Sequence, residues 1–273
     1  NSGQVSATCP QCSGDRKKKK VKCLSINTDE GIWCCHHCGW TGTLANGSQK
    51  TVNLHWRKPE YRKPEKVVES TLSNGALEWL GDRGISETTA TDCGIYVSEV
   101  YMPQSEEVKK AFVFPYYRDG ELINAKYRSG KKEFRSEVGA ERILYGLDDV
   151  KEGDTPVILV EGEMDKLSLW EAGFRNCVSV PDGAPHVNTK DYSSKFDFLN
   201  DDRLQEKQFI LAGDNDAPGQ KLQEELARRL GKEACSRVTW PEGCKDANDV
   251  LKEYGKKILA ECIEHAEPYP IVG

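Results

Sequence analysis

The stretch "VILVEGEMD" (157–165) decides the fold class, because an apolar run leads directly into three acids, the first two separated by a glycine. The apolar run is typical of a strand, and the helical pattern "MDKLSLWEAG" (164–173) follows at once. The alternation continues through "CVSVPDG" (177–183), "FILAGDND" (209–216) and "APGQKLQEELARRLG" (217–231). Alternating strands and helices predict an α/β protein whose parallel sheet is flanked by helices.

Acidic residues follow two of these strands and open a later helix. Because the carboxyl ends of parallel strands meet at one edge of a sheet, at least five carboxylates are expected to converge there. The acids in question are Glu161, Glu163, Asp165, Asp214, Asp216, Asp246 and Asp249.

Converging carboxylates repel one another and are costly to bury without cations. Hard oxygen ligands, with room for water and phosphate, suit magnesium or manganese. Two such ions would activate an attacking hydroxyl and stabilise a pyrophosphate leaving group. Any single motif has an ordinary explanation as a helix cap, and "KDAND" (245–249) has that character. Three motifs in corresponding positions favour a metal site.

A second metal site is predicted at the front of the chain. Six of the eleven cysteines lie within the first 38 residues, whereas a disulfide framework would spread them in pairs. "CPQC" (9–12) and "CHHC" (35–38) have the same spacing, which is typical of a ribbon that holds one structural zinc ion. The expected ligands are Cys9, Cys12, Cys35 and Cys38, and the expected compartment is reducing.

The second knuckle, "GIWCCHHCGWTG" (31–42), offers a choice of ligands. Cys34 and His37 have the same spacing as Cys35 and Cys38, but the glycine after Cys38 supplies the turn that a knuckle needs. Cys34 is therefore expected in the entering strand. Cys23 is expected to pack in another strand rather than to bind metal.

Several residues of this module are candidates for binding nucleic acid. Aromatic rings and exposed imidazoles can stack on or hydrogen-bond unpaired bases, and a basic turn can follow a phosphate backbone. Packing of Trp40 under the ribbon, and a merely solvated basic turn, are the alternatives. The candidates are Trp33, His36, His37, Trp40, Arg16 and Lys17.

The uneven distribution of charge suggests that the two ends of the chain have different binding partners. The net charge is -6, yet the first 66 residues carry 12 Lys and Arg against 5 Asp and Glu. A basic front suits a polyanion and an acidic remainder suits cations, although an imbalance of solvated charges is an equal alternative. No run of about 18 apolar residues and no apolar leader is present, so neither a membrane span nor a signal peptide is expected.

The series "EGE…D" (161–165), "DNDAPG" (214–219) and "KDAN" (245–248) resembles a Toprim domain. The four-cysteine ribbon resembles the zinc-binding domain of bacterial-type primases. The β-rich zone with "INAKYRSGKKEF" (123–134) resembles the N-terminal half of the primase RNA-polymerase module. The whole order of motifs resembles the primase half of the primase-helicases of T-odd phages and of the Twinkle family.

The resemblance implies an order of domains. A zinc-binding ribbon is expected at 1–44, a basic flexible linker at 45–70 and an α+β N-terminal subdomain at 71–156. The Toprim domain is expected at 157–250, and a C-terminal helix with the start of a linker at 251–273. No Walker sequence ending in Gly-Lys-Ser/Thr is present, so the expectation is an excised primase half or a stand-alone primase.

The resemblance also implies roles for single residues. Glu161 is expected to be the catalytic general acid or base, Asp214 and Asp216 the metal-binding pair, and Lys126 and Arg128 the basic pair that contacts nucleotide phosphates or template. Further acids expected to hold the second ion are Glu163, Asp165 and Asp246. Arg142 and Lys245 are weaker candidates for contacting nucleotide phosphates.

The expected function is that of a DNA primase, a nucleotidyltransferase that copies single-stranded DNA into short RNA primers during replication. The ribbon would read a template motif, and ribonucleoside triphosphates would be the substrates. A replicative helicase in cis or trans and a DNA polymerase are the expected partners, in an organelle matrix or a phage-infected bacterial cytoplasm. The rivals are a Toprim metal-dependent nuclease or topoisomerase and a non-catalytic single-stranded DNA-binding module.

Overall fold

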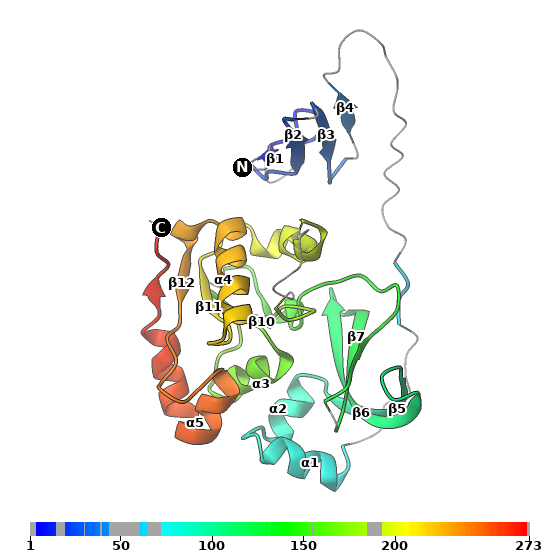
Figure 1. Ribbon diagram of the computed structural model, residues 1–273, viewed down its shortest axis with the longest axis vertical. Coiled ribbons are helices and arrows are strands. Elements are labelled where there is room, and N and C mark those ends of the chain that lie inside the picture. The colour runs from blue at the N-terminus through cyan, green and yellow to red at the C-terminus, as the bar shows by residue number, and fades with distance from the viewer. Residues whose placement is uncertain are drawn as a thin grey trace. The chain divides into compact units, whose positions relative to one another are not determined.

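The chain forms two compact units, residues 1–60 and 61–273, in a computed structural model (Figure 1). Each unit is described by itself. None of the helices in the described part of the chain is both long and apolar enough to cross a membrane. The structure describes residues 4–14, 20–29, 31–38, 40–43, 61–64, 72–130, 132–153, 156–184 and 193–271.

The first unit is a small antiparallel sheet. Its strands, in spatial order, are β1 (Gln4–Ala7), β2 (Leu24–Asn27), β3 (Ile32–Cys35) and β4 (Thr41–Thr43). Its buried hydrophobic residues are Cys9, Leu24 and Cys35. A core of this size is too small to hold a sheet together, so a bound metal is the expected source of stability. The β-rich ribbon predicted from the cysteine spacing is confirmed.

The second unit begins with two short helices, α1 (Asn74–Gly81) and α2 (Glu87–Asp92). The hydroxyls of Ser73 and Ser86 cap them by accepting hydrogen bonds from Ala76 N and Thr89 N. An antiparallel sheet follows, in the order β5 (Tyr96–Met102), β6 (Glu107–Arg118), β7 (Glu121–Ser129) and β8 (Phe134–Ser136). The turn at "RDGE" (118–121) joins β6 to β7 through Asp119 and Gly120, both at positive φ.

The two faces of this sheet have different neighbours. Phe112 and Phe114 of β6 pack into the main core of the unit, whereas Val113, between them, belongs to a separate cluster with Tyr127 of β7. Because side chains alternate along a strand, Lys126 and Arg128, on either side of Tyr127, project from the face that carries the main core. The sheet therefore directs these two cations towards the rest of the unit.

The second sheet has the strand order β10 (Cys177–Ser179), β9 (Val157–Val160), β11 (Phe209–Ala212), β12 (Cys235–Arg237) and β13 (Glu267–Pro268). The first four strands are parallel, as predicted, and β13 is antiparallel. The main helices are α3 (Glu163–Glu171), α4 (Ala217–Leu230) and α5 (Ala247–Glu264). Shorter 3-10 turns are η1 (Leu147–Asp149), η2 (Ser193–Asn200), η3 (Asp202–Leu204) and η4 (Lys232–Ala234).

Helix packing leaves one edge of this sheet available for a site. Helices α3 and α5 pack against each other, and α4 packs on β11 (Figure 1). The chain passes from β9 to one side, through α3 to β10, and then crosses to the other side as β11. Parallel sheets bind ligands at the carboxyl ends of the strands where the direction of winding reverses, which here means β9 and β11.

The last helix departs from the sequence pattern in one respect. A single amphipathic helix is predicted over 246–265, but Gly255 has φ 80° and ψ 179° and interrupts it. Glycine tolerates this conformation because it has no Cβ. The break lies two turns beyond the N-terminus of α5, so the first turns, which carry the predicted acids, keep regular helical geometry.

Candidate functional site

Two adjacent parallel strands position the central acids. Val160 of β9 pairs with Ala212 of β11, so the residues that follow these two strands leave the sheet side by side. Glu161 comes directly after β9, and Asp214 follows β11 by two residues. The predicted convergence at the carboxyl edge of the sheet is therefore present.

Three carboxylates from three elements meet at this edge. Asp165 lies in the first turn of α3, Asp214 follows β11, and Asp246 is the N-cap of α5. One oxygen from each lies within 4.8 Å of one oxygen from each of the others. The Asp246 side chain accepts a hydrogen bond from Asp249 N at 2.8 Å, so its capping role and its place in the cluster coexist.

Burial and mutual repulsion perturb these acids. Burial, followed by the charges of Asp246 and Asp214, raises the pKa of Asp165 well above its ordinary value. Burial also raises the pKa of Asp214, against the opposing effect of Lys245, and the pKa of Asp246, against the Asp249 N–H. A polyvalent cation would remove this electrostatic cost.

Glu161 lies beside the cluster with one oxygen unsatisfied. Its Oε1 accepts a hydrogen bond from Ala184 N at 3.1 Å. Its Oε2 is buried and receives no hydrogen bond from any residue that the structure describes. Burial and the Asp214 charge raise the pKa of Glu161 to about 7. A carboxylate with this pKa and a vacant lone pair is suited to exchange a proton near neutral pH.

The donor set fits a hard divalent cation. The three clustered carboxylates offer only oxygen, and their spacing allows them to share one ion or two neighbouring ions. The unsatisfied Oε2 of Glu161 is a further anionic donor at the edge of the cluster. The arrangement of the acids is therefore suited to binding a divalent metal ion.

Lys245 forms ion pairs with Asp214 and Asp216, which the sequence did not indicate. The Lys245 ammonium lies 2.8 Å from Asp214 Oδ2 and 3.0 Å from Asp216 Oδ2. Asp216 also caps α4 by accepting a hydrogen bond from Gly219 N at 2.9 Å. Burial opposes ionisation of Asp216, but this N–H and Lys245 outweigh it and lower its pKa. Lys245 thus binds the two aspartates here.

Glu163 points to a cation instead of joining the three clustered acids. Its Oε1 accepts a hydrogen bond from the buried Tyr116 hydroxyl and lies 2.8 Å from Lys126 Nζ. Lys126 also donates to the carbonyl of Pro181 at 3.3 Å. Lys126 of β7 and Glu163 of α3 therefore form an ion pair beside the acids. This pair links the β5–β8 sheet to the part of the unit that contains the parallel strands.

The other predicted basic residues are placed differently. Arg128 lies near the Lys126–Glu163 pair on the same face of β7, with its guanidinium carbon 4.7 Å from the centre of the Trp79 ring. Arg142 is half-exposed and forms an ion pair with Asp182, with 3.0 Å between Nε and Oδ2.

The predicted zinc ligands come together in the first unit. The sulfurs of Cys9, Cys12, Cys35 and Cys38 form one cluster, in which the Cys9–Cys38 and Cys12–Cys35 sulfur distances are both 3.7 Å. A tetrahedron of four sulfurs with zinc–sulfur bonds of about 2.3 Å has edges of about 3.8 Å. The cluster therefore has the dimensions of a zinc site.

Cys23 lies closer to this cluster than the sequence suggested. Its sulfur is 3.6 Å from that of Cys35 and 4.0 Å from that of Cys12. Cys34 lies in β3 next to Cys35 and is half-buried. The spacing of the cysteines did not predict that the Cys23 sulfur would lie beside those of Cys12 and Cys35.

The predicted base-reading residues divide into two pairs. Trp33 and Trp40 are partly buried and pack against each other with their ring centres 5.3 Å apart. His36 and His37 are exposed, and His36 Nε2 is 2.7 Å from the Ser25 hydroxyl. Arg16 and Lys17 lie outside the described residues.

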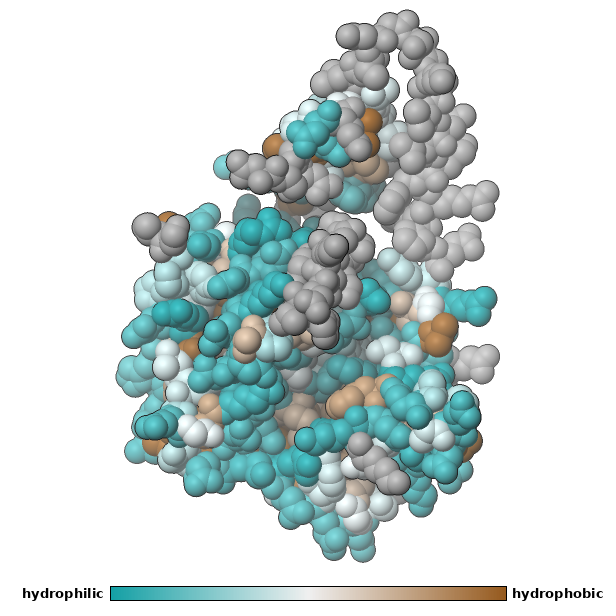
Figure 2. Space-filling view, viewed as in Figure 1, coloured by the Kyte–Doolittle hydropathy of each residue, from teal (hydrophilic) through white to brown (hydrophobic). Residues whose placement is uncertain are grey.

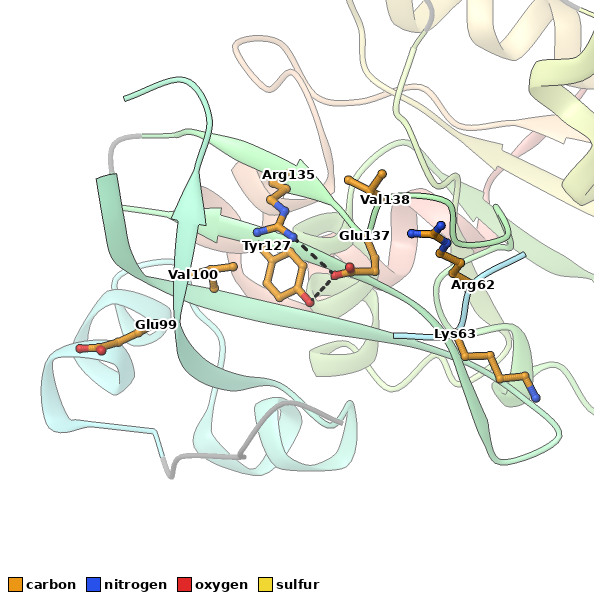
Figure 3. Close-up of a pocket in the computed structure, with 8 residues that line it drawn as sticks. All are labelled: Arg62, Lys63, Glu99, Val100, Tyr127, Arg135, Glu137 and Val138. Carbon is orange, nitrogen blue, oxygen red and sulfur yellow. Dashed lines mark hydrogen bonds and ion pairs between the residues drawn. The ribbon is translucent and has the colours of Figure 1, made fainter. Parts of the chain in front are cut away.

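A separate pocket of about 410 Å³ opens on the β5–β8 sheet, on the face opposite to Lys126 and Arg128 (Figure 3). Glu137 lies between the Tyr127 hydroxyl, at 2.9 Å, and Arg135, at 3.8 Å. Arg62 and Lys63 line the opposite side of the opening in the same view. Tyr127 alternates with Lys126 and Arg128 along β7, so this pocket is distinct from the site with the acids. The surface of the second unit in Figure 2 is mostly hydrophilic, with scattered apolar residues.

Three residues of the site escaped the sequence analysis. Tyr116 is part of an apolar strand pattern and carries no polar signal there. Asn248 lies within "KDAND", and its N–H donates to Asp165 Oδ1 at 3.2 Å. A Cβ at Gly219 would lie 2.3 Å from the carbonyl oxygen of Asp214, so only glycine permits this approach. Gly219 is the last residue of the "DNDAPG" motif, so the sequence did contain a sign of this close approach.

Comparison with known proteins identifies the family. Residues 158–251 match the model of the family described as Toprim-like. Over 96% of its length, the chain is 39% identical to the Primase homolog protein of Arabidopsis thaliana and covers 81% of that protein. The chain belongs to the Twinkle-type primase family. It is also 39% identical to the Twinkle homolog protein, chloroplastic/mitochondrial, of the same plant, and it spans 39% of that longer protein's length.

Solved structures of phage primases share the fold of the Twinkle-type chain. It resembles the primase domain in a bacteriophage T7 assembly of lagging-strand DNA polymerase and gp4 subunits bound to an RNA/DNA hybrid and dTTP. The TM-score is 0.57 at 25% identity, over 70% of this chain and 92% of that one. It also shares the fold of the primase fragment of the T7 primase-helicase, with a TM-score of 0.54 at 22% identity over 95% and 98% of the two chains.

Proposed function

We propose that this protein is a DNA primase that uses divalent metal ions to join ribonucleotides on a single-stranded DNA template. The observation that carries the proposal is the group of Asp165, Asp214 and Asp246, with Glu161 beside it, at the carboxyl edge of a Toprim-like sheet. Membership of the Twinkle-type primase family supports the same activity. The proposed cofactors are one zinc ion in the ribbon and two magnesium or manganese ions among the acids.

The chemistry is assigned to the residues around the acids. Divalent ions held by the three aspartates would lower the pKa of an attacking hydroxyl and neutralise charge on the pyrophosphate. Glu161, with a pKa of about 7 and a vacant Oε2, would accept the proton of that hydroxyl.

Positive side chains at the border of the acids are proposed to hold phosphates. Lys126 is already oriented by Glu163 and the Pro181 carbonyl, so its ammonium reaches the site with little loss of conformational freedom. Lys245 is paired with Asp214 and Asp216, and a metal ion bound there would free its ammonium to contact the triphosphate. Arg142 is proposed to contact nucleotide phosphates more weakly because Asp182 competes for it.

The ribbon is proposed to read the template. His37 is exposed between two zinc ligands, and His36 is exposed and lies beside Ser25, so both imidazoles can reach unpaired bases. Trp33 and Trp40 pack against each other, which assigns them mainly to support of the ribbon.

The test is template-dependent synthesis of labelled oligoribonucleotides with magnesium or manganese. Asp214→Ala combined with Asp216→Ala should reduce synthesis at least about a hundredfold, since metal chemistry contributes several kcal/mol. Glu253→Gln, on the exposed face of α5, is the matched control for loss of a carboxylate. Full activity of the double variant would refute the mechanism.

The same experiment separates the rivals. Release of nucleotides from a labelled strand without ribonucleotides would indicate a nuclease. Binding of single-stranded DNA without synthesis on a library of short templates would indicate a binding module. Neither rival is favoured by the relatives.

Partners and location follow from the relatives as proposals. The T7 assembly contains a lagging-strand DNA polymerase and the T7 fragment comes from a primase-helicase, so a polymerase and a helicase in cis or trans are the proposed partners. The Twinkle homolog's designation as chloroplastic/mitochondrial supports an organelle matrix, with a phage-infected bacterial cytoplasm as the alternative.

A further inference from the structure

A fifth thiol lies against the predicted zinc ligands of the ribbon. The sulfur of Cys23 is 3.6 Å from that of Cys35 and 4.0 Å from that of Cys12. The sulfurs of Cys12 and Cys35 are themselves 3.7 Å apart. These three sulfurs therefore form a triangle with nearly equal sides.

This triangle has the size of one face of a zinc–thiolate tetrahedron. With zinc–sulfur bonds of about 2.3 Å, the edges of such a tetrahedron are about 3.8 Å long. The group in which every sulfur lies within 4.8 Å of every other contains the four predicted ligands and not Cys23. Cys23 is therefore a neighbour of the site, spaced from Cys12 and Cys35 as a further ligand would be.

Pairing between β2 and β3 holds Cys23 in this place. Leu24, the next residue, pairs with Cys35, and the N–H of His36 donates to the Cys23 carbonyl at 2.8 Å. Cys23 thus lies across the sheet from the start of the second knuckle. The backbone of the sheet, and not a knuckle, brings its sulfur to the ligands.

The four predicted ligands differ in their exposure. Cys9 and Cys35 are buried and Cys12 is half-buried, whereas Cys38 is exposed. The Cys38 sulfur lies 3.7 Å from that of Cys9, and the Cys38 N–H donates to the Cys35 sulfur at 3.5 Å. Cys38 is therefore the ligand that is most open to competing chelators and electrophiles.

We propose that Cys23 is a reserve zinc ligand that replaces Cys38. The ion is then held by Cys9, Cys12, Cys23 and Cys35. In this exchange the Cys38 thiolate leaves the site, and the Cys23 thiol binds as a thiolate and releases its proton to solvent. Because the site keeps four sulfur ligands, the ribbon keeps its fold when its exposed ligand does not bind. The inference rests on the zinc ion proposed for the ribbon and is independent of primer synthesis.

The decisive comparison is between Cys38→Ala and a double variant that also carries Cys23→Ser. Cys23→Ser alone tests whether Cys23 is needed while the four predicted ligands are present. Cys34→Ser is the matched control, because it removes another half-buried thiol of the same sheet.

Three measurements on the full chain report on the site. Metal analysis gives the zinc content per chain, and competition with a chromophoric chelator gives the zinc affinity. Replacement of zinc by cobalt gives the number of sulfur ligands, through the intensity of the sulfur-to-cobalt charge-transfer band.

Cys38→Ala should keep one zinc ion per chain, with an affinity about tenfold lower because the Cys23 side chain must leave its preferred rotamer. Its cobalt form should keep the intensity of a site with four thiolates. The double variant should bind zinc at least about a hundredfold more weakly than Cys38→Ala, since only three ligands then share the binding free energy. Cys23→Ser and Cys34→Ser should bind zinc as the wild type does.

The reserve role is wrong if Cys38→Ala loses its zinc, or if the double variant binds zinc as tightly as Cys38→Ala. It is also wrong if the cobalt form of Cys38→Ala has only three thiolates, which would indicate that His36 or His37 is the substitute. Loss of zinc from Cys23→Ser alone would make Cys23 an obligatory part of the site and would refute the reserve role too.

These outcomes are distinct from failure of the proposed function. A wild-type chain that binds no zinc would refute both this inference and the zinc ion proposed for the ribbon. A wild-type chain that binds zinc, with a Cys38→Ala variant that does not, would refute the reserve role alone. Primer synthesis is measured separately, so none of these results decides the role of the clustered acids.

Discussion

Replacing Asp165 with Asn should stabilise the protein when no divalent ion occupies the acids. Asp165 is buried, lies within 4.8 Å of Asp214 and Asp246, and forms no ion pair with any described residue. Asparagine has the same shape, and its Oδ1 can still accept the hydrogen bond from Asn248 N. The substitution therefore removes a charge conflict while leaving packing and capping intact.

The size of the effect can be bounded from the raised pKa. Asp165 ordinarily titrates near 3.8, and complete protonation in the folded state at pH 7 would cost about 4 kcal/mol, at about 1.4 kcal/mol per pH unit. If it stays ionised, repulsion at 4.8 Å costs about 3.5 kcal/mol per neighbour with an effective dielectric constant of about 20. Local relaxation and Lys245 reduce both figures, so we expect a gain of about 2 kcal/mol.

The sign of the pH dependence follows from the same shift. A folded-state pKa above the unfolded one means that the folded protein binds more protons between the two values, so wild-type stability falls as pH rises through that window. Asparagine does not titrate. The advantage of Asp165→Asn should therefore be small near pH 4 and grow as pH rises.

Thermal unfolding of the second unit, followed by calorimetry in buffer without added magnesium or manganese, provides the assay. A gain of about 2 kcal/mol corresponds to about 4 to 8 °C for a unit of this size. Addition of manganese should then stabilise the wild type, by about 2.7 kcal/mol at a hundred times Kd, and the variant far less. Glu253→Gln should behave as the wild type does.

Two results would refute this reasoning. A variant that is less stable than the wild type without metal would mean that Asp165 makes a favourable structural interaction instead of a costly one. An equal response of variant and wild type to manganese would mean that Asp165 is no ligand. Either outcome would remove Asp165 from the proposed metal site.

Three further predictions concern other parts of the chain. Cys35→Ser should lose the bound zinc and Cys34→Ser should keep one ion per chain, as metal analysis of the purified proteins would show. Primer synthesis should rise about tenfold per pH unit while Glu161 is being ionised and level off by about pH 7, because its pKa of about 7 applies without bound cations and cations lower it; a profile without this rise would contradict its role. Gly219→Ala should lower stability by about 1 to 3 kcal/mol and weaken the response to manganese, since the new methyl group would displace the Asp214 backbone.

Much of the fold was predictable because its signals are local. The apolar run before Glu161 and the alternation after it indicated the parallel sheet, and two cysteine knuckles indicated the ribbon. The turn at Asp119 and Gly120 was readable because few residues tolerate positive φ. The break at Gly255 was not, because a glycine within a helical pattern is compatible with either outcome.

The candidate site was predictable in its acids and less so in its cations. Glu161, Asp214 and Asp246 have a clear position after a strand or before a helix. Glu163 looked like one more metal ligand, yet it binds Lys126 and Tyr116, which approach from another sheet. Nothing in the sequence indicated that Arg83 and Arg128 would both lie close to the Trp79 ring.

The sequence by itself determined the kinds of element, the places where strands end in carboxylates, and the two pairs of cysteines that cluster, since each depends on residues close together in the chain. Only the tertiary structure decided which acids share a site, which acid pairs with Lys126, and that Arg83 and Arg128 both lie close to the Trp79 ring. Those outcomes depend on contacts between segments far apart in the sequence, where distance and burial set the electrostatic energy. The spacing of residues along the sequence does not predict these long-range contacts.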